Sequence, residues 1–171
     1  ERRALLYKFS PGHSSWAQTY YNPADYPTAT EQQRRIMAAP SGPTPHPTRG
    51  RGSLRDALSK RVVVADGAMG TMLQAADPSL DDFQGHGGCN EILNVTRPEL
   101  VASVHDAYFA VGVDCVETNT FGANYANLGE YGISDRIYEL AEAGAAIARR
   151  VANGWTAPGH PRWVLGSVGP G

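Results

Sequence analysis

Apolar and polar positions define two kinds of segment from residue 53 to the end of the chain. Short runs with strand character occur at residues 62–65, 113–118 and 163–168. Between them lie longer stretches with apolar residues at every third or fourth position, which is typical of amphipathic helices. This succession of strand, helix and strand predicts an α/β fold with right-handed crossovers and a parallel sheet.

Two long helices are expected from their start and stop signals. Residues 96–99, Thr-Arg-Pro-Glu, read as a capping box with proline in the first turn, and Gly112 supplies the stop of that helix. Ser134 is the expected N-cap of the second helix, which ends at residues 153–154, Asn-Gly. Each helix carries an apolar stripe that predicts packing against the sheet.

Two shorter helices and one long loop complete the expected pattern. Ser53 is a candidate N-cap for a short helix that leads into the first strand. Residues 66–71 read as a strand-to-helix turn, because residues 72–76 favour a helix over a returning strand. Residues 77–93 read as a long loop, and loops of this length in compact domains are often functional.

The first 50 residues differ in composition from the rest. They hold seven of the twelve prolines and lack a sustained period, which predicts a disordered leader over residues 1–50 and one domain over residues 51–171. Residues 1–61 carry ten Lys or Arg and four Asp or Glu, against five and thirteen in residues 62–171. The arginines are scattered, so we expect no nucleic-acid binding. Because the chain opens with Glu1, Met37 is a candidate for the natural start.

The cysteines, histidines and apolar runs favour a protein of the reducing cytoplasm. Cys89 and Cys115 are the only cysteines, and the sequence shows no signal peptide and no apolar run near the roughly 20 residues of a membrane span. Cys115 lies between apolar neighbours and is expected in the core, and neither cysteine has zinc-site spacing. His86 and His105 lack a nucleophile partner and are expected to be structural or surface residues.

Polar and glycine-rich groups follow each expected strand. Carboxyl ends of parallel strands form the ligand-binding rim of barrels and open sheets, which predicts that residues 66–71, 117–120 and 167–169 meet. Asp66 and Glu117 could accept hydrogen bonds from an ammonium group, while backbone N–H groups of the glycine-rich turn could hold a carboxylate. Spacing alone leaves open a turn role for Asp66 and a solvated rim carboxylate for Glu117.

Four ordered motifs give a more specific indication. They are Val64–Thr71 (VADGAMGT), Cys89–Asn94 (CNEILN), Glu117–Asn124 (ETNTFGAN) and Gly166–Gly171 (GSVGPG). In sequence and order they resemble the homocysteine-binding module of the cobalamin-dependent methionine synthase family, over residues 53–171. The resemblance implies a (β/α)₈ TIM barrel, of which this truncated chain supplies about the first three βα units.

The resemblance also implies a substrate and its place. Homocysteine would lie over the strand ends, with its amino group near Asp66 and Glu117 and its carboxylate near the turn from Gly67 to Thr71. The substrate-binding residues that it implies are Asp66, Gly67, Ala68, Met69, Gly70, Thr71, Glu117, Thr118, Asn119 and Ser167.

The family's reaction needs groups that the resemblance does not place in this chain. A zinc ion held by three cysteines stabilises the homocysteine thiolate, which attacks the methyl group of methylcobalamin. Methyltetrahydrofolate then recharges the cobalamin. Because the zinc cysteines, including a Cys-Cys pair, lie on later strands, the resemblance implies that this chain binds neither zinc nor cobalamin and is inactive alone, with the folate and cobalamin modules downstream.

Three alternatives stay open. A cobalamin-independent homocysteine methyltransferase, with betaine or S-methylmethionine as donor, shares the barrel and the zinc chemistry, although residues 89–94 and 117–124 favour the cobalamin type. A catalytically inactive binding fragment is the second, because three parallel strands leave an open edge that lowers stability. A flavodoxin-like fold is the third and fits poorly, because about 50 residues separate successive strands, far more than its short βα units need.

Overall fold

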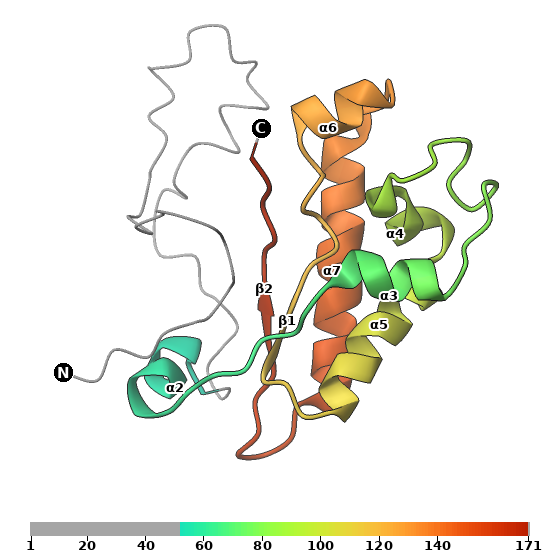
Figure 1. Cartoon of the computed structure of the whole chain (residues 1–171). Helices are drawn as coiled ribbons and strands as arrows, with labels where there is room; N and C mark the ends of the chain where they lie inside the picture. Colours follow the sequence, from blue (N-terminus) through green and yellow to red (C-terminus); the bar gives the residue numbers. More distant parts are fainter. Residues whose placement is uncertain (1–51, 171) are drawn as a thin grey trace, which may run out of the picture. The chain divides into compact units, whose positions relative to one another are not determined.

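The computed structural model describes residues 52–170, which fall within one compact unit. The expected leader, residues 1–50, and the candidate start at Met37 lie outside the described residues. The elements, in chain order, are α2 (Leu54–Lys60), α3 (Met69–Ala75), η2 (Asn90–Ile92), α4 (Leu93–Thr96), α5 (Pro98–Ala110), β1 (Cys115–Glu117), α6 (Tyr125–Glu130), η3 (Ser134–Arg136), α7 (Ile137–Trp155) and β2 (Trp163–Leu165) (Figure 1).

The sheet joins three segments of the chain in parallel. Strand β1 pairs with β2, with Val116 opposite Val164, and Ala65 forms a single parallel bridge to Cys115 on the other edge of β1. The order in space is therefore residues 62–65, then β1, then β2. A flavodoxin-like sheet places its first strand between the second and third, so this order contradicts that alternative.

The expected strand at residues 62–65 is wrong in extent, because only Ala65 pairs in a bridge. The side chains of Val62 and Val64 are 69% and 52% exposed, and within residues 52–170 no further strand covers that edge. The other two strands are also shorter than expected, at 115–117 and 163–165. A ladder needs partners along its length, so β-favouring residues without neighbours stay irregular.

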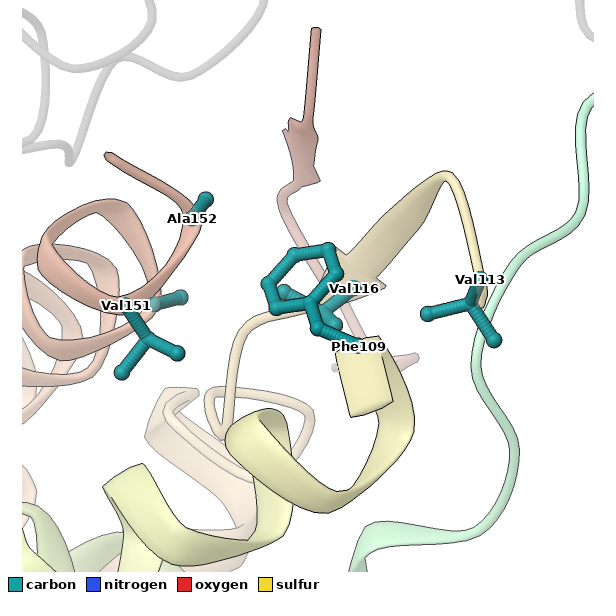
Figure 2. Packing of buried hydrophobic residues seen from close by; sticks show 6 residues of the cluster. Phe109, Val113, Val116, Val151 and Ala152 are labelled. Carbon is teal, nitrogen blue, oxygen red and sulfur yellow. The ribbon is translucent and has the colours of Figure 1, made fainter. Parts of the chain in front are cut away.

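Helices α5 and α7 pack against each other and lie on the same side of β1 and β2 (Figure 1). Figure 2 shows the cluster where they meet the sheet, with Phe109 of α5 close to Val116 of β1. Val151 and Ala152 supply the α7 side of this cluster. Burying a phenylalanine side chain contributes about 2–3 kcal/mol, so Phe109 is a principal anchor of the layer.

Both long helices begin differently from the capping signals. Thr96 is the last residue of α4, and its hydroxyl donates to the Ile92 carbonyl at 3.1 Å. It therefore does not cap α5, although Pro98 occupies the first turn as expected. Ser134 lies in η3 and makes no side-chain cap for α7, which begins at Ile137. In both cases a preceding helical turn takes up the expected N-cap residue.

Two boundaries near the first strand are also corrected. Helix α3 begins at Met69 instead of residue 72, so the turn after Ala65 is shorter than the sequence indicates. The expected loop over residues 77–93 ends at Cys89, because η2 and α4 follow directly. The segment from Cys89 to Asn94 is thereby a compact buried turn of helix.

At the amino ends of the strands, Asp114 fixes the incoming chain. Its carboxylate accepts hydrogen bonds from the Arg61 guanidinium at 2.7 and 2.8 Å and from the Val64 backbone N–H at 2.9 Å. The hydrogen bond from Arg61 is the main reason why the pKa of Asp114 lies below its usual value. These hydrogen bonds align the segment that ends at Asp66 with β1.

No helix among residues 52–170 combines the length and the apolar character that crossing a bilayer requires. His105, on α5, is fully buried, and neither of its ring nitrogens has a hydrogen-bond partner. Of the two roles expected for it, the structure shows a core residue rather than a surface one. Burial lowers the pKa of His105 to about 4, because a charged imidazolium cannot be hydrated there.

The buried His105 predicts an acid-dependent loss of stability. Its pKa is about 4 in the folded chain, against 6.5 for an ordinary histidine, so between these pH values the unfolded chain binds more protons than the folded one. The free energy of unfolding should therefore fall by roughly 3 kcal/mol as pH drops from 6.5 to 4. Urea unfolding of the wild type and of His105→Leu between pH 6.5 and pH 4 measures this loss of stability. An equal slope in the wild type and in His105→Leu would refute the prediction.

Candidate functional site

Polar side chains from three successive parallel segments meet where those segments end. The Asp66 carboxylate accepts from the Glu117 backbone N–H, with its two oxygens at 3.0 and 3.1 Å. The Ser167 hydroxyl donates to Oε2 of Glu117 at 3.1 Å. The structure therefore brings Asp66, Glu117 and Ser167 together at one rim, and these are the residues that the sequence placed at the strand ends.

Two threonine hydroxyls link β1 to the chain beyond β2. The Thr118 Oγ1 accepts from the Ser167 N–H at 3.0 Å and lies 2.6 Å from the Thr120 Oγ1, whose hydroxyl donates to the Ser167 carbonyl at 2.7 Å. Each hydroxyl has one proton. Because the Thr120 proton goes to Ser167, the Thr118 hydroxyl must donate to Thr120. The order of donors is thus fixed through the network.

The turn after Asp66 is exposed at its start. Gly67 and Ala68 are exposed, whereas Met69, Gly70 and Thr71 form the first turn of α3. The Tyr108 hydroxyl donates to the Ala68 carbonyl at 3.2 Å and would lie 3.1 Å from a Cβ at Gly67. A side chain at position 67 would therefore press on Tyr108. Burial, and then the charge of Asp66, raises the pKa of Tyr108, which keeps its hydroxyl a donor.

Asn119 is buried and bonded on both of its amide hydrogens. Its Nδ2 donates to the Asn90 carbonyl at 2.8 Å and to the Oδ1 of Asn94 at 2.9 Å. Asn119 thus joins the loop after β1, residues 118–122, to η2 and α4. Thr118 joins the same loop to Ser167. Both residues lie at the expected position, with side chains bonded within the protein.

Sequence reasoning assigned no role to Glu91 and Asn94, which the structure places against the same loop. Oε1 of Glu91 accepts from the Gly122 N–H at 2.6 Å, and Nδ2 of Asn94 donates to the Asn119 carbonyl at 2.8 Å. Both side chains are buried. The available signal was their position in the Cys89–Asn94 motif, where polar residues flank the apolar pair Ile92 and Leu93.

The two cysteines do not form a metal site. Both are buried free thiols, and burial raises the pKa of Cys89 and raises that of Cys115 to about 12. The nearby carboxylates Asp66, Asp114 and Glu117 add to the shift at Cys115. Metal binding needs the thiolate. Across residues 52–170, no group of three or more His, Cys, Asp or Glu side chains is arranged to hold a metal ion.

Comparisons with known proteins show which family and which proteins this chain is similar to. Residues 63–171 match the family model described as homocysteine S-methyltransferase. Methionine synthases of Mycobacterium tuberculosis strain H37Rv and Mycobacterium leprae are 61% and 58% identical to the chain over 118 residues, which is 69% of this chain and 10% of each relative. The chain thus spans about a tenth of the length of these curated relatives.

Solved structures show the same likeness at lower identity. The homocysteine methyltransferase MmuM from Escherichia coli, in its metallated and oxidized forms, is 28% identical, with TM-scores of 0.55 and 0.56. The match covers 68% of this chain and 41% and 40% of those chains. The fold described here is therefore a mixed α/β arrangement similar to part of that enzyme.

The hydroxyl network predicts a measurable contribution from Thr118. Thr118→Val keeps the shape of the side chain but leaves the Ser167 N–H without its acceptor, which should lower the free energy of unfolding by about 1–3 kcal/mol. Urea unfolding of the 171-residue chain measures this. Thr71→Val, at an exposed position on α3, is the matched control and should change stability by less than about 0.5 kcal/mol. Equal effects of the two substitutions would contradict the role of the network.

Proposed function

Because the chain belongs to the homocysteine S-methyltransferase family, we propose that residues 51–171 form the amino-terminal part of the homocysteine-binding domain of a methionine synthase. The complete enzyme would transfer a methyl group from methylcobalamin to homocysteine, giving methionine, with methyltetrahydrofolate recharging the cobalamin. The observation that carries this proposal is the 61% identity to a methionine synthase over 69% of the chain.

The rim supports recognition of an amino acid. Asp66 and Glu117 supply carboxylates for the substrate's ammonium group, and the exposed turn from Gly67 to Thr71 supplies backbone N–H groups for its carboxylate. The hydrogen bond from Ser167 restricts the orientation of the Glu117 carboxylate. In this proposal, Thr118 and Asn119 shape the rim through their bonds to neighbouring segments.

The described residues do not fit a zinc site, so we derive no metal-dependent step from them. Cys89 and Cys115 are buried and hold their protons. When bound, zinc stabilises a substrate thiolate, and cobalamin supplies the methyl group. We assign both groups to parts of the complete enzyme outside residues 52–170. Residues 51–171 alone would then bind substrate without catalysing the transfer.

We propose that the three parallel segments are the start of a (β/α)₈ barrel. Their order in space follows their order in the chain, and helices α5 and α7 lie on one side of the strands, as the outer helices of a barrel do. The likeness to the E. coli enzyme, at a TM-score of 0.55, agrees with this arrangement. We place the enzyme in the cytoplasm, where thiols such as Cys89 and Cys115 stay reduced.

The alternative methyl donors are S-methylmethionine and betaine. Identity favours cobalamin, since the methionine synthases are 58–61% identical and the E. coli homocysteine methyltransferase is 28% identical. The complete polypeptide that carries this chain should form methionine from homocysteine with methylcobalamin and not with the other two donors. Mass spectrometry of the product, with zinc content measured in parallel, checks this. Activity with S-methylmethionine alone would replace the cobalamin proposal with the alternative.

The acidic pair predicts a specific kinetic effect. Glu117→Gln and Asp66→Asn keep side-chain shape but remove the charges proposed to bind the ammonium group. Losing a charge-assisted hydrogen bond of about 1.5–3 kcal/mol should raise KM for homocysteine roughly 10- to 100-fold, with a smaller change in kcat. Steady-state kinetics of the complete enzyme measure both constants. Glu142→Gln, exposed on α7, serves as the control, and unchanged KM in both rim variants would refute the assignment.

A further inference from the structure

The loop that follows β1 is hydrogen-bonded to buried polar side chains from other segments of the chain. It comprises residues 118–122 and directly follows Glu117, so its position sets the position of that carboxylate. The side chains that hold it, Glu91 and Asn94, belong to η2 and α4, which are separate in the chain from every strand of the sheet. Because these segments lie far apart along the chain, local structure does not explain their contact, which needs a separate physical reason.

Glu91 is the less expected of the two side chains. It is 8% exposed, its Oε1 accepts from the Gly122 N–H at 2.6 Å, and no Lys or Arg forms an ion pair with it in the described part of the chain. Burying a carboxylate without a cation costs several kcal/mol. An apolar side chain would fill the space at lower cost. What the carboxylate provides is a short, directional bond to one backbone N–H of the loop.

Asn94 holds the same loop one turn further along. Its Nδ2 donates to the Asn119 carbonyl at 2.8 Å and to the Leu140 carbonyl on α7 at 3.0 Å, and its Oδ1 accepts from the Asn119 side chain at 2.9 Å. Asn94 therefore bonds both to the main-chain carbonyl and to the side-chain amide of Asn119, in a buried place. This arrangement ties the loop, α4 and α7 at a single point.

Two glycines make these contacts sterically possible. A Cβ at Gly122 would lie 2.7 Å from Oε1 of Glu91. A Cβ at Gly144, on α7, would lie 2.7 Å from Nδ2 of Asn94 and 2.8 Å from Cγ2 of Thr120. Real Cβ atoms do not approach so closely, so any side chain at either position must displace the loop or its partners.

We propose that Glu91 and Asn94 are positioning residues for substrate: together with Gly122 and Gly144 they hold the loop at 118–122 so that Glu117 meets the substrate's ammonium group. This inference rests on the proposed function and assigns the Cys89–Asn94 segment its role. Neither side chain needs to touch homocysteine. Their effect is on affinity, because a displaced loop misplaces the carboxylate that binds the amino group.

The first test compares two substitutions of Glu91 in the complete enzyme. Glu91→Ala removes the acceptor of the Gly122 N–H, and the dissociation constant for homocysteine should rise about tenfold, with kcat at saturating homocysteine changed less than about threefold. Glu91→Gln still offers an oxygen to Gly122 and should restore most of the affinity. Calorimetry, steady-state kinetics and hydrogen exchange of residues 118–122 give the readouts. Faster exchange in this loop should accompany the loss of affinity.

The second test perturbs the loop from α7 and leaves Glu91 intact. Gly144→Ala should weaken homocysteine binding about tenfold, because the new methyl group displaces Asn94 and Thr120. Gly154→Ala, on the same helix with no atom within 4 Å of the added Cβ, should leave binding unchanged. The comparison of Gly144→Ala with Gly154→Ala tests the positioning role even where Glu91→Ala fails to fold.

The outcomes separate the two proposals. A wild-type enzyme without affinity for homocysteine overturns the proposed function and the positioning role with it. A wild type that binds, with equal affinity in Glu91→Ala or in Gly144→Ala despite a lowered Tm, leaves the function standing and overturns the positioning role, because a purely structural side chain changes Tm alone.

Discussion

Backbone N–H and C=O groups lose their ladder partners where parallel strands end, and the rim of this protein is organised by the need to satisfy them. Side chains do so at three points. The Asp66 carboxylate accepts from the Glu117 N–H, Thr118 accepts from the Ser167 N–H, and Glu91 accepts from the Gly122 N–H. Because every acceptor comes from another segment, meeting a local requirement also fixes how the segments lie relative to each other.

The same bonds determine which groups the rim can offer to a ligand. A side chain that is bonded to the backbone on one side has a restricted orientation on the other, which reduces the entropy lost on binding. Glu117 illustrates this, since Asp66 holds its backbone and Ser167 holds its carboxylate. At the opposite ends of the strands, Arg61 and Asp114 align the first segment, so that Asp66 reaches Glu117. The geometry of the rim thus depends on the hydrogen bonds between Arg61 and Asp114 at the other end of the sheet.

Much of this arrangement follows from sequence patterns. The apolar stripes of the two long helices, the parallel pairing of the strands and the meeting of Asp66, Glu117 and Ser167 are all periodic or topological features, and the structure agrees with them. The N-caps at Thr96 and Ser134 do not follow, because a preceding turn of helix competes for those residues. A capping motif describes a local preference and contains no information about the turn before it.

The contacts of Glu91 and Asn94 could not be predicted from spacing for a different reason. Their partners lie 31 and 25 residues further along the chain, and polar residues in an expected loop are usually solvated. The matching glycines give the available hint, since Gly122 and Gly144 lie where no other residue would fit. Without the fold, however, each glycine reads only as a flexible point in a loop or a weak point in a helix.

The charge of the rim has a consequence for the proposed chemistry. Asp66, Glu117 and Glu91 are acidic, which suits an ammonium group but opposes the formation of a thiolate, because neighbouring carboxylates raise the pKa of a thiol. Cys115 shows the effect inside the protein: burial raises its pKa to about 12, with Asp66 and Glu117 contributing. A homocysteine bound by its amino group at this rim must therefore direct its sulfur away from these acids. The positive charge that stabilises the thiolate then has to come from the opposite side of the substrate, where our proposal places residues of the complete enzyme beyond those described.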